Sequence, residues 1–123
     1  MNKQPVRSYQ DLAAWQNARE LNYEIYQVTK EFPQDERFGL ISQIRRAAVS
    51  IPSNIAEGYG RGSRADYIRF LRIARGSLFE VETQLILSSD LGFVNDDLRN
   101  ELNEKIAAVA RPLSGLIRSL ETT

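Results

Sequence analysis

The chain has 123 residues and a mass of 14.0 kDa, which suits one domain built around a single core. Hydrophobic residues make up 42% and charged residues 26%, values that argue against a disordered or membrane-embedded chain. Sixteen Lys and Arg balance sixteen Asp and Glu, unlike the uniformly basic surface of a dedicated nucleic-acid binder. Cysteine and histidine are absent, which excludes disulfides, zinc fingers, thiolate nucleophiles and histidine acid–base catalysis.

The sequence carries no signal for export or membrane insertion. The first ten residues, MNKQPVRSYQ, lack the apolar segment of a secretory signal. The uncharged stretch 47–56 contains Pro52 and is far shorter than the roughly 20 apolar residues that cross a bilayer. We therefore expect a cytoplasmic protein with no membrane partner.

The first expected helix covers residues 9–32. Its apolar residues recur at steps of three and four, which places them on one side of a helix. They are Ala14, Ala18, Leu21, Ile25, Val28 and Phe32. Ser8 and Asp11 have the spacing of a capping box that opens the helix, and Pro33 ends it.

The second expected helix covers residues 37–58. Its apolar stripe consists of Ile41, Ile44, Ala48, Ile51 and Ile55. Gly58 is expected just past the helix end, where glycine can adopt a positive φ. Pro52 lies inside the pattern and removes one backbone hydrogen bond, so it either kinks the helix or ends it near Ser50.

The third and fourth expected helices cover residues 64–91 and 96–121. Ser63 and Asp66 resemble a helix start, Gly92 a stop, and Asn95 a cap for the last helix, which Pro112 interrupts. The third stripe consists of Tyr67, Leu71, Ala74, Leu78, Val81 and Leu85. The fourth consists of Leu98, Leu102, Ile106, Val109, Leu113, Leu116 and Leu120.

These patterns predict an all-α fold, an antiparallel up-down-up-down four-helix bundle that forms a single domain over residues 1–123. No stretch alternates with period two, and no Asn-Gly or Asp-Gly hairpin signal is present, so strands are not expected. Helices of about 20 residues joined by short connections favour antiparallel neighbours.

Two helices carry more apolar residues than one inward stripe needs. Trp15 and Tyr26 lie beside the first stripe, and Ile68, Phe79 and Ile86 lie beside the third. A wide four-helix core could absorb flanking positions, and isolated surface hydrophobes are common. Large apolar patches are uncommon on monomers, however, so we expect these five residues to form an interface between copies of the chain in a homo-oligomer.

No catalytic, metal-binding or cofactor-binding residues are expected. A di-iron bundle needs Glu-x-x-His pairs, and Glu80 and Glu82 are two apart and point in different directions on a helix. Ser50 and Ser53 have no histidine to activate them, and the three lysines are distant in sequence. We therefore expect a protein without enzymatic activity, cofactor or small-molecule substrate.

The segment 58–64 is rich in glycine and could cradle a phosphate. Its backbone amides precede a helix start, and Arg61 and Arg64 add positive charge. It matches neither nucleotide-binding glycine fingerprint. A glycine cap followed by a turn between helices is the favoured interpretation.

Charge is distributed unevenly along the chain. Residues 37–75 hold eight arginines and two carboxylates, a net of +6, whereas the other residues hold eight basic and fourteen acidic side chains, a net of −6. The candidate nucleic-acid or anion face consists of Arg45, Arg46, Arg61, Arg64, Arg69 and Arg72. Alternatively, the arginines meet the acidic side chains of the last helix, within one subunit or across an interface. Those side chains are Asp96, Asp97, Glu101 and Glu104.

Several strings together resemble one protein family. Asp11-Leu12 precedes Trp15-Gln16, Phe32-Pro33 precedes Glu36-Arg37-Phe38-Gly39-Leu40, and Gly76-Ser77-Leu78 precedes Glu80, Glu82 and Gln84-Leu85. The longest string is Gln43-Ile44-Arg45-Arg46-Ala47-Ala48-Val49-Ser50-Ile51-Pro52-Ser53-Asn54-Ile55-Ala56-Glu57-Gly58. From about Tyr9 to Leu120 the chain resembles the 23S ribosomal RNA intervening-sequence protein family.

The resemblance implies a bacterial, cytosolic four-helix bundle that assembles as a ring, a homopentamer, and has no established enzymatic activity. It also implies that Pro52 is carried within the second helix. A related branch, the accessory variability determinant of diversity-generating retroelements, acts with nucleic acid through a basic surface, whereas this chain is neutral overall. We therefore expect a non-enzymatic, self-associating scaffold or adaptor. The alternative is an accessory protein that binds RNA or DNA through the arginines.

Overall fold

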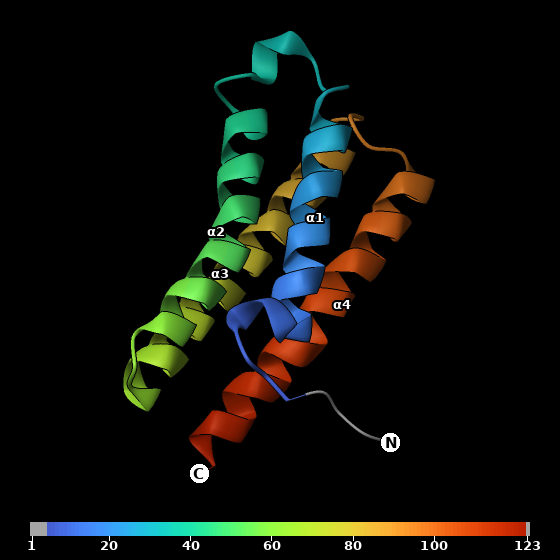
Figure 1. The fold of residues 1–123 in the computed structure, drawn as a ribbon. Helices are drawn as coiled ribbons and strands as arrows, with labels where there is room; N and C mark the ends of the chain where they lie inside the picture. Colours follow the sequence, from blue (N-terminus) through green and yellow to red (C-terminus); the bar gives the residue numbers. More distant parts are fainter. Residues whose placement is uncertain (1–4, 123) are drawn as a thin grey trace.

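The computed structural model describes residues 5–122, which fold into four long helices with two short 3-10 turns near the first of them. The helices are α1 (Ala13–Thr29), α2 (Leu40–Gly60), α3 (Arg64–Asp90) and α4 (Asp96–Glu121). Figure 1 shows that consecutive helices run in opposite directions, so α1 and α3 point one way and α2 and α4 the other. The all-α, antiparallel four-helix arrangement is confirmed for one copy of the chain.

The helices occupy the corners of a square. Each packs against its neighbours in sequence, and α1 also packs against α4, which closes the bundle. The α2–α3 contact is the most extensive of these. The α2–α3 side of the bundle therefore lies opposite the α1–α4 side.

The start of α1 differs from the expected residue 9. Ser8 and Asp11 do form a capping box, but it caps a 3-10 turn, η1 (Tyr9–Asp11), rather than α1. Leu12 then takes an extended conformation with φ −74° and ψ 129°, so the α-helix begins at Ala13. At the other end α1 stops at Thr29, before Phe32.

Helix α2 begins at Leu40, three residues later than expected. A second 3-10 turn, η2 (Gln34–Glu36), precedes it, and the Glu36 side chain accepts a 3.2 Å hydrogen bond from the Leu40 amide. The helix continues through Pro52 rather than ending near Ser50. Pro52 has no N–H to donate to the Ala48 carbonyl. The Ser53 hydroxyl donates a 2.8 Å hydrogen bond to the carbonyl of Val49, the residue four positions before it.

Gly58 does not terminate α2 as expected. It is a buried helical residue, and a Cβ added there would lie 2.8 Å from the Phe70 Cβ and 3.2 Å from the Tyr67 carbonyl oxygen. Its role is to let α2 and α3 approach each other closely. The turn between them instead uses Gly62, whose φ is 87°.

The last two helices have the expected boundaries to within one residue. Ser63 and Asn95 accept hydrogen bonds from the amides of Asp66 and Leu98 and so cap α3 and α4. Gly92, with φ 81°, follows the end of α3. Helix α4 continues through Pro112.

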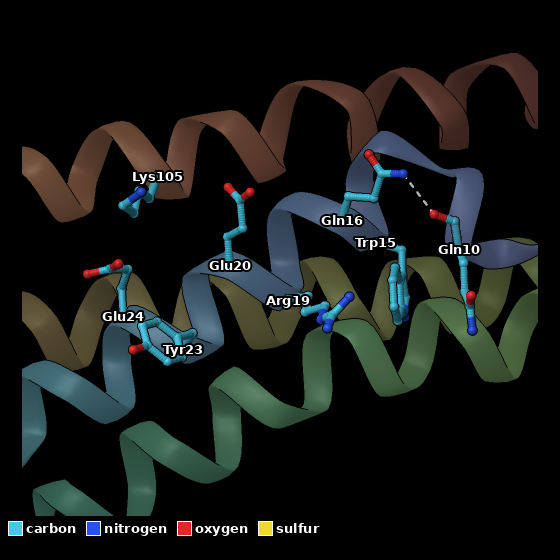
Figure 2. A pocket seen from close by; sticks show the side chains of 8 residues that line it. All are labelled: Gln10, Trp15, Gln16, Arg19, Glu20, Tyr23, Glu24 and Lys105. Atoms are coloured by element: carbon cyan, nitrogen blue, oxygen red, sulfur yellow. Dashed lines mark hydrogen bonds between the residues drawn. The ribbon is translucent and has the colours of Figure 1, made fainter. Parts of the chain in front are cut away.

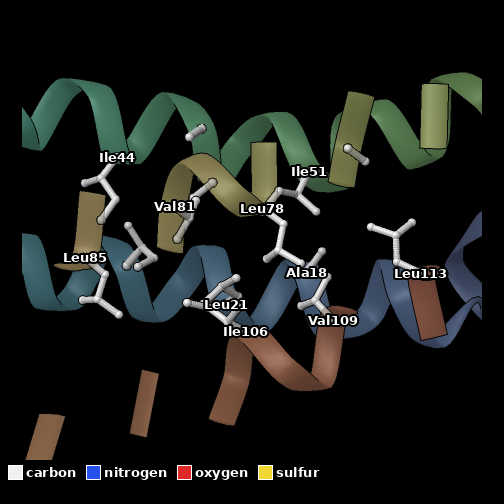
Figure 3. Packing of buried hydrophobic residues seen from close by; sticks show 14 of the residues in the cluster. Ala18, Leu21, Ile44, Ile51, Leu78, Val81, Leu85, Ile106, Val109 and Leu113 are labelled. Carbon is white, nitrogen blue, oxygen red and sulfur yellow. The ribbon is translucent and has the colours of Figure 1, made fainter. Parts of the chain in front are cut away.

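The apolar stripes converge on one core (Figure 3). Leu21, Ile51, Leu78 and Val109 are essentially inaccessible to solvent, one from each helix. Within the expected stripes, Val28, Ile41 and Leu116 are only partly buried, at the margin of this core. No helix among the described residues combines the length and apolarity needed to span a membrane.

Candidate functional site

The half-buried side chain of Arg45 packs across the α1–α2 contact. Its guanidinium lies 4.6 Å from the centre of the Tyr26 ring and donates hydrogen bonds to the Thr29 hydroxyl at 2.8 Å and the Tyr26 carbonyl at 3.3 Å. These contacts hold the Arg45 side chain against α1. Its surroundings indicate a packing role.

Arg61 and Arg69 form a cluster around Phe70 at the α2–α3 turn. Their guanidinium carbons lie 5.2 and 4.4 Å from the centre of the Phe70 ring. Asp66 lies 3.8 Å from Arg61 and 3.6 Å from Arg69, and Glu57 also approaches Arg61 at 3.8 Å. Because these pairs are long and about half exposed, each contributes little to stability.

The remaining arginines of the expected face are spread over the bundle. Arg72 pairs with Glu121 of α4. Arg64 opens α3 beside the Arg61–Arg69 cluster in sequence. Arg46 lies in the N-terminal half of α2. There it lines a hollow of about 270 Å³ together with Glu80 and the hydrogen-bonded hydroxyls of Ser50 and Ser77. The structure therefore brings four of the six arginines toward one end of the bundle and leaves Arg45 and Arg46 apart.

Charge separates along the bundle axis, a feature that the linear sequence conceals. The half containing η1 and the α2–α3 turn comprises residues 5–20, 51–77 and 109–122, with nine arginines and five carboxylates, a net of +4. The other half, residues 21–50 and 78–108, has six basic and eleven acidic side chains, a net of −5. Reversal of the chain direction at each turn places Arg111 and Arg118 of α4 in the basic half, where sequence reasoning had not placed them.

The five residues expected at an interface do not form one patch within a copy. Trp15 and Tyr26 on α1 are half-buried, and Trp15 packs edge-to-face against Tyr9 with ring centres 5.3 Å apart. Ile68 on α3 is also half-buried, whereas Phe79 is 56% exposed and Ile86 40% exposed. Since α1 and α3 occupy diagonal corners, the two groups could meet only between copies.

Helix α3 and Leu91, the residue just after it, expose further apolar side chains that were not predicted from the sequence. Ile73, Leu87 and Leu91 are 42%, 46% and 58% exposed. Leu87 and Phe79 line a second hollow of about 390 Å³ on the α2–α3 side, which shares Glu80 with the hollow beside Arg46. The signal was available as the high apolar content of residues 67–87. The whole outer surface of α3 is thus partly apolar.

A larger hollow of about 720 Å³ lies over the outer surface of α1 (Figure 2). Trp15 and Tyr23 contribute aromatic surface, and Glu20 and Glu24 contribute carboxylates. Lys105 is the α4 residue in this lining. In Figure 2 Glu20 extends toward α4, while Arg19 lies beside Trp15 on the side of α2, with its guanidinium carbon 5.8 Å from the Trp15 ring.

An aromatic cluster closes the basic end of the bundle. Tyr59 packs edge-to-face against Tyr67 at 5.9 Å and contacts Tyr9 at 6.4 Å. Burial, with a smaller contribution from Tyr59, raises the pKa of Tyr67 to about 12. A phenol that stays protonated at neutral pH and packs against rings is a structural group rather than a proton carrier.

The arrangement of polar side chains gives no nucleophile or metal site among residues 5–122. Ser50 and Ser77 share a 2.8 Å hydrogen bond, and the Asn54 amide donates to the Ser50 hydroxyl at 2.8 Å, so neither serine faces a base. The described residues contain no group of three acidic side chains that could hold a metal ion. These serines serve the contact between α2 and α3.

Both the sequence and the fold of this chain are similar to those of known proteins. A family model described as 23S rRNA-intervening sequence protein matches residues 10–115. A solved structure of a protein of unknown function from the S23 ribosomal protein family of Bacteroides thetaiotaomicron is similar, with a TM-score of 0.79 and 25% sequence identity. The similarity covers 85% of this chain and 95% of that one. No curated protein matches the sequence.

Proposed function

This chain belongs to the 23S rRNA-intervening sequence protein family, and from that membership and its surface we propose that it is a non-enzymatic, self-associating scaffold or adaptor of the bacterial cytoplasm. The solved relative is itself of unknown function, so the role is argued from the surface of this chain. That surface offers apolar and charged contact area in place of a catalytic group.

The observation that carries the proposal is the exposed apolar surface of α3. Phe79 and, about two turns later, Ile86 and Leu87 are each at least 40% exposed. Exposed apolar side chains that gather on one helix mark an interaction surface more often than an ordinary monomer surface. Covering them with another copy of the chain would remove them from water.

We propose five copies, the number that the family resemblance implies, arranged as a ring. A ring needs two different contact surfaces on each copy, because every subunit touches one neighbour with one side and the other neighbour with another. The apolar groups on α1 and α3 lie at diagonal corners and so suit such a contact. A repeated binding surface around the ring would give a partner several simultaneous weak contacts.

The experiment is sedimentation velocity over a range of micromolar concentrations, comparing the wild type with Phe79→Lys. Placing a charge at this exposed position should shift the protein toward slower-sedimenting species while the helical circular dichroism stays unchanged. Ala65→Lys, at an exposed position near the start of α3, is the matched control and should sediment as the wild type does. Equal sedimentation of all three proteins at the value of a single copy would refute self-association.

Nucleic-acid binding is the second candidate function. The Arg61–Arg69 cluster favours it, because guanidinium groups held flat on an aromatic ring at a basic end could contact phosphates and bases. We expect Arg61→Gln with Arg69→Gln to weaken the binding of a labelled single-stranded RNA, measured by fluorescence anisotropy, and wild-type affinity to fall as salt rises. No anisotropy change at low salt would exclude this function.

A further inference from the structure

A hollow of about 160 Å³ lies between the end of α1 and the start of α2, at the end of the bundle opposite the α2–α3 turn. Lys30, Arg37 and Arg45 supply three cationic side chains to its lining, and no carboxylate among the described residues lines it. The C-terminus of α1 and the N-terminus of α2 adjoin the hollow with partial charges of opposite sign, so the three cations set its charge. The hollow is therefore positive within a half of the bundle that is negative overall.

The carboxylates nearest in sequence do not neutralise these three cations. Glu31, Asp35 and Glu36 lie on the connecting segment, but in the part of the chain that the structure describes none of them forms an ion pair. The Glu36 carboxylate instead accepts the 3.2 Å hydrogen bond from the Leu40 amide at the start of α2. The hollow therefore lacks a counter-ion such as Asp66 provides to the arginines at the other end of the bundle.

Arg45 is held in position by its own hydrogen bonds. Its Nε donates to the Thr29 hydroxyl at 2.8 Å and its Nη2 to the Tyr26 carbonyl at 3.3 Å. Nη1 is left as a donor without a partner among residues 5–122. A half-buried guanidinium that is already fixed in this way loses little conformational freedom when it binds a ligand.

Phe38 supports the second arginine of the hollow. The Phe38 side chain is 89% exposed, so its burial contributes little to the core. The guanidinium carbon of Arg37 lies 5.4 Å from the centre of its ring, a cation–π contact that favours one orientation of an otherwise flexible side chain. The contact gives this exposed ring a role, which is to position Arg37 beside the hollow.

We propose that this hollow binds the phosphate group of a small phosphorylated molecule. Two guanidinium groups and an ammonium group suit the charge and the several acceptor oxygens of a phosphate dianion better than a single carboxylate. The net charge of −5 on this half of the bundle would repel the further phosphates of RNA or DNA, which favours a molecule with one phosphate. This ligand adds to the scaffold proposed above and does not depend on self-association.

The bound molecule would be a ligand and not a substrate. The Thr29 hydroxyl lines the hollow, but it donates a 2.7 Å hydrogen bond to the Ile25 carbonyl and accepts one from Arg45. No carboxylate among the described residues lines the hollow to act as a general base for this hydroxyl. The site therefore has groups that bind an anion and lacks groups that would transform it.

The test is a titration of the whole protein with inorganic phosphate at about pH 8, where phosphate is largely a dianion, at constant ionic strength. Line broadening in phosphorus NMR should show saturable binding to the wild type. Lys30→Gln and Arg37→Gln should each raise the dissociation constant by about tenfold, the loss expected for one charge-assisted hydrogen bond. Arg46→Gln, at an exposed arginine outside the hollow, is the matched control and should bind as the wild type does. Circular dichroism checks that each variant is folded.

The positioning role of Phe38 is tested in the same titration. Phe38→Leu should raise the dissociation constant by about two- to fivefold, because the cation–π contact with Arg37 is lost. Phe38→Tyr keeps a ring beside Arg37 and should bind as the wild type does. Equal binding by the leucine variant, or a loss that tyrosine does not rescue, would contradict this role.

Four other outcomes would overturn the phosphate site. The first is a wild-type protein that shows no saturable binding. The second is binding that Arg61→Gln with Arg69→Gln abolishes while Lys30→Gln and Arg37→Gln leave it intact, which places the phosphate at the other end of the bundle. The third is displacement of phosphate by an equal concentration of acetate, which assigns the hollow to carboxylates. The fourth is displacement by a short single-stranded RNA at lower phosphate concentrations than glycerol phosphate requires, which assigns it to nucleic acid.

Discussion

The side-chain amide of Asn17 donates a 2.8 Å hydrogen bond to the backbone carbonyl of Ala108, across the α1–α4 contact. In a regular helix that carbonyl would accept from the amide of residue 112, but residue 112 is proline and has no N–H. Asn17 therefore supplies the donor that Pro112 removes. An interruption in α4 is in this way compensated by a side chain from α1.

Removing this donor should destabilise the bundle. We expect Asn17→Ala to lower the free energy of unfolding by about 1–2 kcal/mol, because it leaves a partly buried carbonyl without a partner. In a Pro112→Ala background, where the helix supplies its own donor, the same substitution should cost clearly less. Urea denaturation of the four proteins measures the coupling, and equal losses in both backgrounds would contradict the compensation.

Substitution by alanine should have opposite effects at two glycines, because Gly58 lies at the close contact between α2 and α3 and Gly115 lies in open space on α4. Gly58→Ala should destabilise by about 1–3 kcal/mol, since the new Cβ would meet the Phe70 Cβ at 2.8 Å. Gly115→Ala, with no neighbouring atom within 4 Å, should stabilise α4 by about 0.5–1 kcal/mol. Thermal melts of both variants test this pair, and a stabilising Gly58→Ala would be inconsistent with the packing.

The raised pKa of Tyr67 predicts that the free energy of unfolding falls at high pH. Its pKa is raised to about 12 from the ordinary 10.0, so between these pH values the folded protein holds a proton that the unfolded chain releases. Folding is therefore favoured fully below pH 10 and progressively less as the pH rises toward 12. Tyr67→Phe should flatten this dependence in urea titrations, whereas Tyr23→Phe, at a 62% exposed position, should leave it unchanged.

Two adjacent arginines should behave differently. Arg45→Ala should destabilise by about 1–2 kcal/mol through loss of the Tyr26 stack and the Thr29 hydrogen bond. Arg46→Ala should change the unfolding free energy by no more than about 0.5 kcal/mol, because Arg46 is exposed. Denaturation of the dilute protein measures both, and equal effects would show that Arg45 is not a packing residue.

Helical periodicity accounts for most of what the sequence predicted about the fold. Steps of three and four placed Leu21, Leu78 and Val109 on inward faces, and all are buried. Gly58 was misassigned because a glycine near a helix end can serve as a terminator or permit close packing. The tertiary contact with Phe70 decides between them, and it is absent from the linear sequence.

The candidate surfaces were harder to predict because they depend on which helices become neighbours. Arg45 and Arg46 are adjacent in sequence, yet one packs against Tyr26 and the other lines an open hollow on the α2–α3 side. The axial separation of charge arises from the reversal of direction at each turn, which a count along the chain cannot reveal. The exposure of Leu87 and Leu91 could not be predicted either, because it depends on which side of α3 packs against the core.

The molar mass of the wild-type protein in solution tests self-association most directly. Light scattering coupled to size-exclusion chromatography at micromolar concentrations should give a particle of five copies of 14.0 kDa, or 70 kDa. A mass of 14.0 kDa at every concentration would contradict the account, because Phe79 and Ile86 would then remain exposed to water without a partner.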